Sequence, residues 1–190
     1  MNYYIADTHF GHRNIINFDG RPFHDITEMK LALIARWNKR VTSEDTVFIL
    51  GDFCWGKAPE WIELLSALNG NKVLIRGNHD LRNMPAELRH MFADVKDYKE
   101  IKDGDRLVIM CHYPIPCYKK DYDPNVYMLH GHVHETQEWA HTHTIVSFMK
   151  ESNPEKYQGH VYNVGAMMDY IDYTPRTLDE IIAGGSKYYE

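Results

Sequence analysis

Cysteine is scarce in this sequence, and long apolar runs are missing altogether. The chain has three cysteines, an odd number, and no C-x-x-C pair; they are Cys54, Cys111 and Cys117. This argues against a disulfide framework and predicts a reduced, cytoplasmic protein. No apolar run approaches the roughly 20 residues that a membrane helix needs, and no basic segment precedes an apolar one at the start. Neither a membrane span nor the usual export signal is therefore expected.

An excess of positive charge is also missing. The chain has 21 Lys and Arg residues against 27 Asp and Glu residues, for a formal net charge of −6. Extended binding to nucleic acid therefore has little electrostatic support, although a metal centre would still attract a single phosphate. The sequence shows no internal repeat and no low-complexity tract, and its 190 residues with 44% apolar content predict one globular domain spanning residues 1–190.

What the sequence does contain is a repeated pattern of short apolar runs that end in metal-type ligands. The carboxyl ends of strands in open α/β sheets converge on one crevice, so these side chains are expected to form one site. The runs are residues 3–6 before Asp7 and His9, 46–50 before Asp52, 72–76 before Asn78, 107–111 before His112, and 126–129 before His132 and His134.

The segments between these runs predict an α/β protein. Helical periodicity over residues 26–41 follows an Asp25 cap, and a second helix is expected over residues 60–68 after Pro59. The resulting strand, helix, strand, helix, strand order favours parallel crossovers.

The second half of the chain predicts other elements. A hairpin is expected from residues 95–101 and 106–111, implying a second sheet or a mixed extension of the first. A last strand over residues 161–165 and a helix after a Thr177 capping box complete the chain. Residues 10–24 are expected to form a loop, and residues 135–160 an inserted excursion, because neither shows a clear period.

The ligand types and their number predict chemistry at phosphorus. Asp7 with His9, and His132 with His134, are spaced two apart, so in extended chain each pair would point to one side and chelate. Seven oxygen and nitrogen ligands without a thiolate are too many for one tetrahedral zinc, but they suffice for two ions if one carboxylate bridges. Asp52 is the expected bridge because it follows the central strand, and two such ions clamp an in-line displacement of a phosphate ester.

Two residues next to the ligand Asn78 are candidates for catalysis. His79 is expected to protonate or stabilise the leaving oxygen, and Asp80 is expected to fix the tautomer of His79.

The motifs Asp7-Thr8-His9, Gly51-Asp52, Gly77-Asn78-His79-Asp80, His112 and Gly131-His132-Val133-His134, in this order, resemble the signature of the calcineurin-like metallophosphoesterase superfamily. The opening run Asp7-Thr8-His9-Phe10-Gly11-His12 is similar to a small bacterial and phage branch of it. The resemblance implies a four-layer α/β/β/α sandwich with two mixed sheets and a dinuclear centre at the carboxyl ends of the strands. It implies one ion held by Asp7, His9, Asp52 and His134, another held by Asp52, Asn78, His112 and His132, a bridging hydroxide, and no covalent phosphoenzyme.

One departure from the family pattern bears on the substrate. Phosphoprotein-type members place an arginine soon after Gly-Asp to clamp the phosphate, whereas this chain has Phe53-Cys54-Trp55-Gly56. The absence favours a phosphodiester over a monoester as the small phosphate-ester substrate, with a nucleotide as one candidate. The alternatives are a phosphomonoesterase or nucleotide phosphatase, and a non-catalytic binding scaffold, which would be free to lose His79.

The ligand mixture excludes a soft-metal site but does not choose among harder ions. Manganese is expected, with iron, zinc and nickel as alternatives, and the oligomeric state is left open. His12, Arg13 and Arg21 in the loop after the first motif are candidate phosphate contacts, with a solvated loop as the alternative. His130, His141, His143 and His160 fit no metal-site spacing and are assigned to polar surface.

Overall fold

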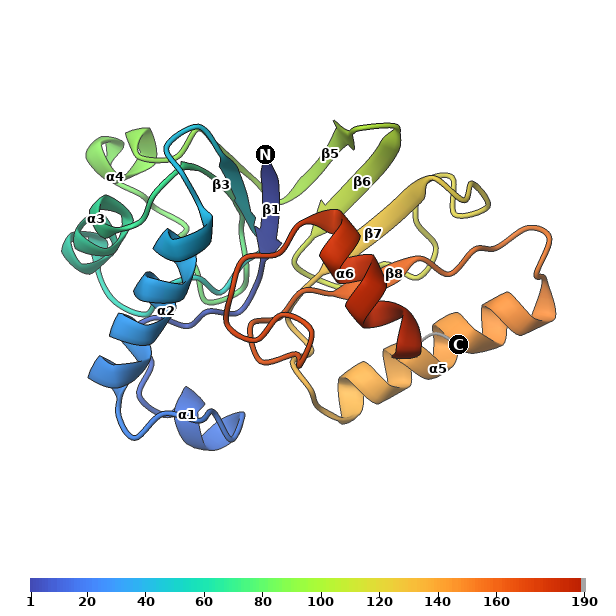
Figure 1. Ribbon diagram of the computed structural model, residues 1–190, viewed down its shortest axis with the longest axis horizontal. Helices are drawn as coiled ribbons and strands as arrows, with labels where there is room; N and C mark the ends of the chain where they lie inside the picture. Colours follow the sequence, from blue (N-terminus) through green and yellow to red (C-terminus); the bar gives the residue numbers. More distant parts are fainter. Residues whose placement is uncertain (189–190) are drawn as a thin grey trace.

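Two four-stranded β-sheets form the centre of the protein, whose computed structural model describes residues 1–188 (Figure 1). The first sheet has the order β1-β2-β3-β4 and the second β5-β6-β7-β8. All pairs in the first sheet are parallel, whereas in the second β5 and β6 are antiparallel and the others parallel. The strands are β1 (Asn2–Ile5), β2 (Thr46–Ile49), β3 (Asn71–Ile75), β4 (Asp94–Lys96), β5 (Tyr98–Asp103), β6 (Arg106–Cys111), β7 (Val126–His130) and β8 (Val161–Asn163).

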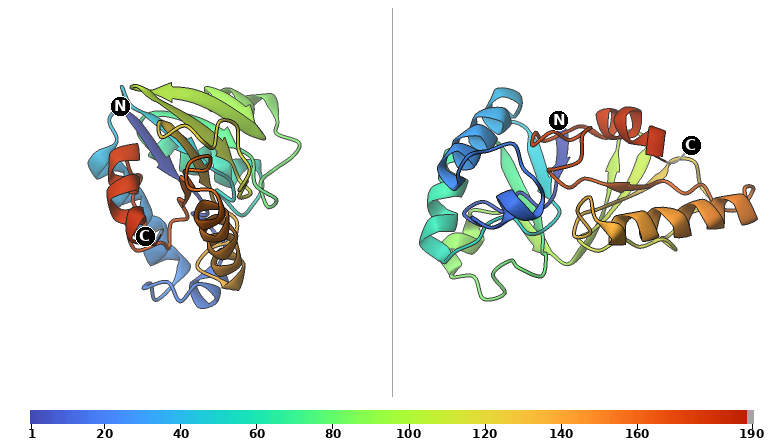
Figure 2. Two further views of the ribbon diagram at one scale, coloured as in Figure 1. Left: turned by 90° about the vertical axis from the view of Figure 1, so that its right-hand side faces the viewer. Right: turned by 90° about the horizontal axis from the view of Figure 1, so that it is seen from below.

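Helices cover the sheets from outside. Helices α2, α3 and α4 lie beside the first sheet, and α5 and α6 lie on the side of the second (Figures 1 and 2). This arrangement confirms the predicted α/β architecture of two sheets flanked by helices. None of the helices within residues 1–188 combines the length and apolar character that crossing a bilayer requires. The helices are α1 (Ile15–Phe18), α2 (Ile26–Arg40), α3 (Ala58–Ala67), α4 (Ala86–His90), α5 (Gln137–Ser152), α6 (Leu178–Gly185) and the short 3₁₀ helix η1 (Ser186–Tyr188).

Helix α2 shows how the sequence specifies these elements. The Asp25 carboxylate accepts hydrogen bonds from the backbone N–H groups of Thr27 and Glu28, which caps the first turn as predicted. Met29, Leu33 and Trp37 then recur every four residues and are buried, so one stripe of the helix packs toward the first sheet.

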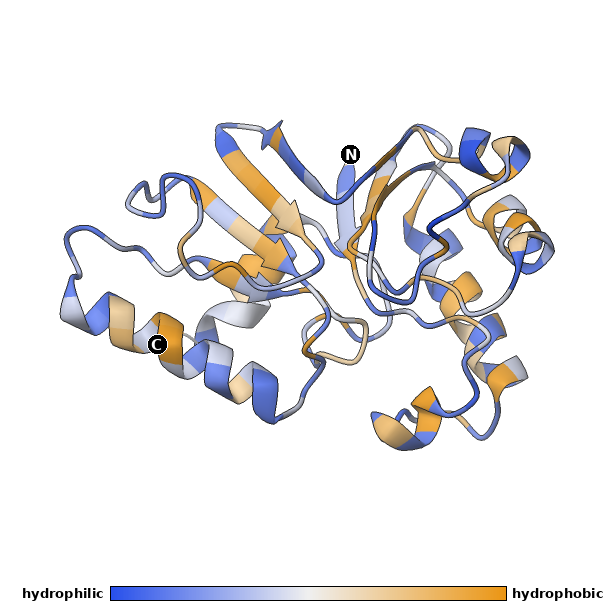
Figure 3. Cartoon of the chain, turned by 180° about the vertical axis from the view of Figure 1, so that it is seen from behind, coloured by the Kyte–Doolittle hydropathy of each residue, from blue (hydrophilic) through white to orange (hydrophobic). Residues whose placement is uncertain are grey.

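The two sheets meet at the carboxyl end of β1. Ala6 donates a hydrogen bond to the Val164 carbonyl and accepts one from Ala166, both at 2.8 Å, which connects β1 to the chain just after β8. One cluster of buried apolar side chains contains residues of both sheets, and Figure 3 shows apolar residues along the strands of the second sheet. The single-domain interpretation of residues 1–190 stays a prediction that this shared core supports.

The prediction of a single strand over residues 95–101 is wrong. The chain breaks at Asp97, so β4 pairs with β3 in the first sheet while β5 pairs with β6 in the second. Arg76 at the end of β3 forms a bidentate ion pair with Asp97, with N–O distances of 2.8 and 2.9 Å. This pair lies at the point at which the chain passes between the sheets.

Two segments expected to be irregular contain helix. The loop over residues 10–24 includes α1, and the excursion over residues 135–160 is largely α5, a helix of 16 residues. Val146 is the one buried residue described in α5, so the helix buries too little of its surface to leave a clear apolar period in the sequence. Helix α4 was also not predicted.

Candidate metal centre and active-site cavity

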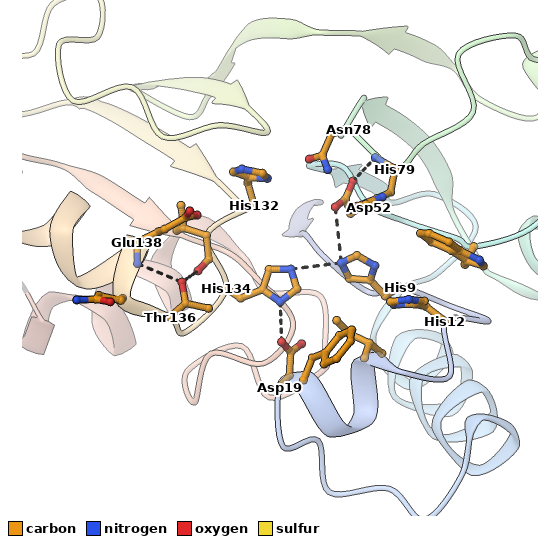
Figure 4. Close-up of a pocket in the computed structure, with 15 residues that line it drawn as sticks. His9, His12, Asp19, Asp52, Asn78, His79, His132, His134, Thr136 and Glu138 are labelled. Atoms are coloured by element: carbon orange, nitrogen blue, oxygen red, sulfur yellow. Dashed lines mark hydrogen bonds and ion pairs between the residues drawn. The ribbon is translucent and has the colours of Figure 1, made fainter.

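The seven predicted ligands lie together at the carboxyl ends of five strands, and Figure 4 shows several of them around one cavity. Asp7 is fully buried, and Asp52 and His9 are nearly so. Two groups of side chains each bring their potential ligand atoms within 4.8 Å of one another. One group is Asp7, His9 and His134, and the other is Asp7, Asp52 and His112. Asp7 follows β1, Asp52 follows β2, Asn78 follows β3, His112 follows β6, and His132 and His134 follow β7.

Asp7 is common to both groups, and Asp52 of the second group also lies beside His9 of the first. One of its carboxylate oxygens, Oδ2, is 3.6 Å from His9 Nε2, and the other, Oδ1, is 3.6 Å from His112 Nε2. The backbone N–H of His79 donates to Oδ1 at 3.0 Å and holds the carboxylate in this orientation. Each oxygen is therefore directed toward a different histidine, as a carboxylate that bridges two ions requires.

The hydrogen bonds of His112 leave one of its ring nitrogens available to a cation. Its Nδ1 lies 2.8 Å from the Leu50 carbonyl oxygen and must donate to it, so Nε2 of the neutral imidazole carries a lone pair. That lone pair faces Asn78 Oδ1, another acceptor, at 3.0 Å. Two acceptors in this arrangement are unfavourable alone and suited to a shared metal ion.

His134 and His9 repeat this arrangement in the first group. His134 Nδ1 donates to the Asp19 carboxylate at 2.7 Å, and its Nε2 lies 3.3 Å from His9 Nε2 and 3.7 Å from Asp7 Oδ1. A carboxylate behind a metal-binding imidazole fixes its ring and raises its basicity. Asp19 therefore supports the predicted ligand His134, although nothing near it in the sequence indicates this role.

The backbone of the ligand segments is not extended. Asp7, His9, Asp52, His132 and His134 all have positive φ, between 45° and 70°. The prediction that alternation in an extended chain brings each pair to one side is therefore wrong in its reason, although the side chains do converge. Left-handed backbone costs about 1–2 kcal/mol per non-glycine residue, and such strain concentrates at functional sites.

Glycines beside the ligands leave space that the ligands fill. A Cβ on Gly51 would lie well inside 3.0 Å of the His112 ring, one on Gly77 would overlap the Asp52 carboxylate, and one on Gly131 would overlap the Asp7 carboxylate. The glycine that precedes each ligand in the Gly-Asp, Gly-Asn and Gly-His motifs thus makes room for a ligand from another strand.

Asp80 does not touch the imidazole of His79 in the way the sequence analysis expected. Its carboxylate accepts hydrogen bonds from the backbone N–H groups of Asp52, Phe53 and Gly77, at 2.8–3.0 Å. Burial raises the pKa of Asp80 to about 6. The residue therefore ties the loop after β3 to the loop after β2, and the expectation that it orients His79 is wrong because its side chain points inward.

The three loop residues proposed as phosphate contacts have different positions. His12 lines the cavity. Arg13 is exposed and lines a separate hollow beside α1 and α2. Arg21 is buried and donates to the carbonyl oxygens of Asp7 and Thr8 and to Asp19, so the proposed phosphate contact of Arg21 is wrong. Its guanidinium instead supports the first ligand loop and the carboxylate behind His134.

Comparison with known proteins agrees with this geometry. The sequence model of the family described as calcineurin-like phosphoesterase matches residues 3–157. The chain belongs to the calcineurin-like phosphoesterase family. It is 33% identical over 182 residues to the uncharacterized protein MJ1445 of Methanocaldococcus jannaschii, covering 95% of this chain and 88% of that one. It is 29% identical over 164 residues to the gene 66 protein of Mycobacterium phage D29, covering 70% and 77%.

The fold is also that of a solved structure. The crystal structure of AQ665, a protein of unknown function from Aquifex aeolicus, aligns with a TM-score of 0.69 and 27% identity over 96% of this chain and 98% of that chain. Because the chain belongs to the calcineurin-like phosphoesterase family and carries groups of Asp and His residues that could hold metal, it is a metal-dependent phosphoester hydrolase. Its substrate class is a small phosphate ester.

The electrostatics of the phosphoesterase site suit divalent cations. Burial raises the pKa of Asp7 to about 7 and lowers the pKa of His9, His112 and His132. The imidazoles are thus neutral near pH 7, with lone pairs free for metal. Burial also lowers the pKa of His134, but its hydrogen bond to Asp19 and the charges of Asp7 and Asp19 outweigh burial and raise that pKa overall.

A cavity of about 650 Å³ opens beside the phosphoesterase ligands, within the size range of small-molecule sites. The neighbouring rings of His12, Phe18 and Trp55 line one side of it. Thr136 and Glu138, at the start of α5, also line it, and Figure 4 shows them across the cavity from His12. Across residues 1–188, no lysine or arginine is among the side chains that line it.

Proposed function

We propose that this calcineurin-like phosphoesterase hydrolyses a phosphodiester. The observation that carries the proposal is the cavity lining, which lacks lysine and arginine within the described chain but includes Glu138 and Asp19. A dianionic monoester would lack a cationic side chain there and would meet carboxylates. A diester carries a single negative charge, which two metal ions neutralise without help.

The ligand geometry supports the assignment of Asp7, His9, Asp52 and His134 to one ion and of Asp52, Asn78, His112 and His132 to the other. Asp52 directs one oxygen toward each group, and His132 lies with its ring centroid 5.1 Å from that of His112. When bound, two divalent ions lower the pKa of a water molecule and neutralise the non-bridging phosphate oxygens. The ligand types fit manganese, with iron, zinc and nickel as alternatives.

His79 is placed to act on the leaving group. Its backbone N–H is fixed by Asp52, while its exposed ring lies on the cavity wall, 6.0 Å from the His9 ring centroid. In the proposed reaction the oxygen of water bonds to phosphorus and its proton passes to solvent. The P–O bond to the leaving group breaks, His79 gives the leaving oxygen a proton, and solvent then returns a proton to His79. Such general acid catalysis contributes about 10²- to 10⁴-fold in rate.

A specific observation favours a phosphomonoesterase as the second candidate. Arg82 is exposed and lines a neighbouring cavity of about 440 Å³, which shares Asn78 with the main one. If the substrate phosphate reached this side of Asn78, Arg82 would supply the missing cationic clamp. The exposed arginine therefore provides a residue with which to test the two candidates.

The decisive experiment compares an aryl phosphate monoester with the bis-aryl diester in Mn²⁺, repeated with Fe²⁺, Zn²⁺, Ni²⁺ and Mg²⁺. We expect the diester to be turned over faster than the monoester. His79→Ala should lower the rate of diester hydrolysis at least about 100-fold, and Arg82→Met should leave that rate unchanged. Asp52→Asn is expected to abolish turnover because it affects both ions. Faster monoester turnover that Arg82→Met removes would establish the second candidate instead.

The proposed location is the cytoplasm. Cys54, Cys111 and Cys117 are all free thiols, which is typical of reducing compartments. Fractionation of cells with an antibody to the protein would test this, and recovery with exported proteins would contradict it.

A further inference from the structure

Large aromatic rings are exposed on one wall of the active-site cavity. Trp55 is 47% exposed and Phe18 is 74% exposed. His12 lies between them, stacked on Trp55 with ring centroids 4.5 Å apart and planes at 27°, and 6.3 Å from Phe18. We call His12, Phe18 and Trp55 the aromatic wall. Exposed apolar groups that adjoin a cavity often mark a binding site.

The aromatic wall adjoins the residues proposed to do the chemistry. The Trp55 ring centroid is 5.4 Å from that of His79, and the His12 centroid is 5.6 Å from that of His9. His79 is the proposed proton donor to the leaving oxygen, so a group that leaves from phosphorus would come away beside Trp55. The wall is therefore on the leaving-group side of the site.

The backbone that carries Trp55 is held in place. The N–H of Trp55 donates to the Phe10 carbonyl at 2.7 Å, and Phe10 forms a β-bridge with Cys54. Gly11 lies so close that a Cβ there would be 2.7 Å from the Trp55 carbonyl oxygen. A ring on a fixed segment provides a binding surface that loses little entropy when a ligand stacks on it.

We propose that the aromatic wall binds a planar ring of the leaving group, so that the substrate is a phosphoester whose leaving alcohol is a nucleoside. The inference rests on the proposed function and names the substrate class of the same site. The wall directly adjoins His9 and His79, whose ring centroids lie 5.6 and 5.4 Å from those of rings in the wall, so a ribose would join the phosphate at the site to the base on the wall. The absence of lysine and arginine from the cavity lining described above suits a neutral base, because base and aromatic ring stack without a charge partner.

Competitive inhibition of diester hydrolysis by adenosine, the product-like nucleoside, tests the proposal in the Mn²⁺ enzyme. We expect adenosine to compete with the substrate. Methyl riboside, which lacks the base, should not inhibit. Trp55→Ala should raise the adenosine inhibition constant about tenfold or more, while Trp55→Phe, which keeps a ring, should stay within about threefold. Phe148→Ala is the matched control, because Phe148 is 68% exposed on α5 and does not line the cavity.

Equal adenosine inhibition of the wild type and Trp55→Ala would overturn the proposal, as would equal inhibition by methyl riboside. Equilibrium dialysis of adenosine against the same Mn²⁺-loaded proteins measures binding without turnover. If no phosphoester is hydrolysed, the proposed function fails, and dialysis still decides whether Trp55 binds the base. If hydrolysis is metal-dependent but Trp55→Ala binds adenosine normally, only the aromatic wall fails.

Discussion

Replacing Gly77 by alanine should damage the metal centre through sterics alone. The added Cβ would overlap Asp52 Oδ1 and lie 2.5 Å from the Asp52 backbone nitrogen. Gly77 cannot easily move away, because its N–H donates to Asp80 at 2.8 Å. The carboxylate proposed to serve both ions would therefore have to rotate out of its position.

Both stability and metal affinity should fall in Gly77→Ala. Overpacking of this kind costs about 1–3 kcal/mol, which corresponds to a fall of roughly 2–12 °C in the melting temperature of a chain this size. Displacement of the groups that orient a ligand typically weakens metal binding by about 10- to 100-fold. Calorimetric titration with Mn²⁺ and thermal unfolding with and without Mn²⁺ would measure the two effects.

Gly104→Ala is the matched control for Gly77→Ala. Gly104 has a φ of +62° with no atom within 4 Å of an added Cβ, so alanine there adds backbone strain of about 1 kcal/mol without a clash. It should lower the melting temperature slightly and leave Mn²⁺ affinity unchanged. Wild-type Mn²⁺ affinity in Gly77→Ala would refute the reasoning that this glycine makes room for the bridging carboxylate.

Three further predictions concern titratable side chains in or beside the site. Asp19→Asn should weaken Mn²⁺ binding by about tenfold or more, because it removes the charge behind His134; unchanged affinity in calorimetry would contradict this. Burial raises the pKa of Asp7, and the Asp52 charge raises it further. In EDTA, Asp52→Asn, which removes that charge, should therefore melt no lower than the wild type; a clearly lower melting temperature would argue against two like charges in the site. Burial lowers the pKa of His130 to about 4, so on acidification the unfolded chain binds a proton at this histidine before the folded chain does. As pH falls from about 6.5 to 4, the free energy of unfolding of the wild type should therefore fall by about 3 kcal/mol relative to that of His130→Asn. Parallel urea unfolding curves in EDTA at both pH values would show whether this gap appears.

The convergence of the predicted ligands could be expected from the sequence because each follows a strand whose end is apparent there. The signals were Gly-Asp, Gly-Asn and Gly-His at the ends of apolar runs, and they identified Asp52, Asn78 and His132 without knowledge of the fold. Why a glycine precedes each could not be predicted. Its neighbour is a ligand from a different strand, such as His112 beside Gly51, and such contacts depend on the tertiary structure.

The supporting residues were missed or misassigned for the same reason. Asp19 is separated from His134 by 115 residues, and Asp80 from Phe53 by 27, so nothing near either carboxylate in sequence indicates its partner. His130 was assigned to polar surface but is fully buried, because it ends a central strand of the second sheet. Arg21 was expected to contact phosphate because the local sequence around an arginine does not reveal whether its side chain is buried or exposed.

The left-handed backbone of five ligand residues has a consequence for how this fold can change over evolution. Left-handed backbone costs free energy at non-glycine residues, so a descendant freed from catalysis would gain stability by accepting glycine at these positions. Relatives that had become pure scaffolds should therefore show glycine or asparagine at positions equivalent to His9 or His134. In this chain histidine is present at both, as the proposed metal centre requires.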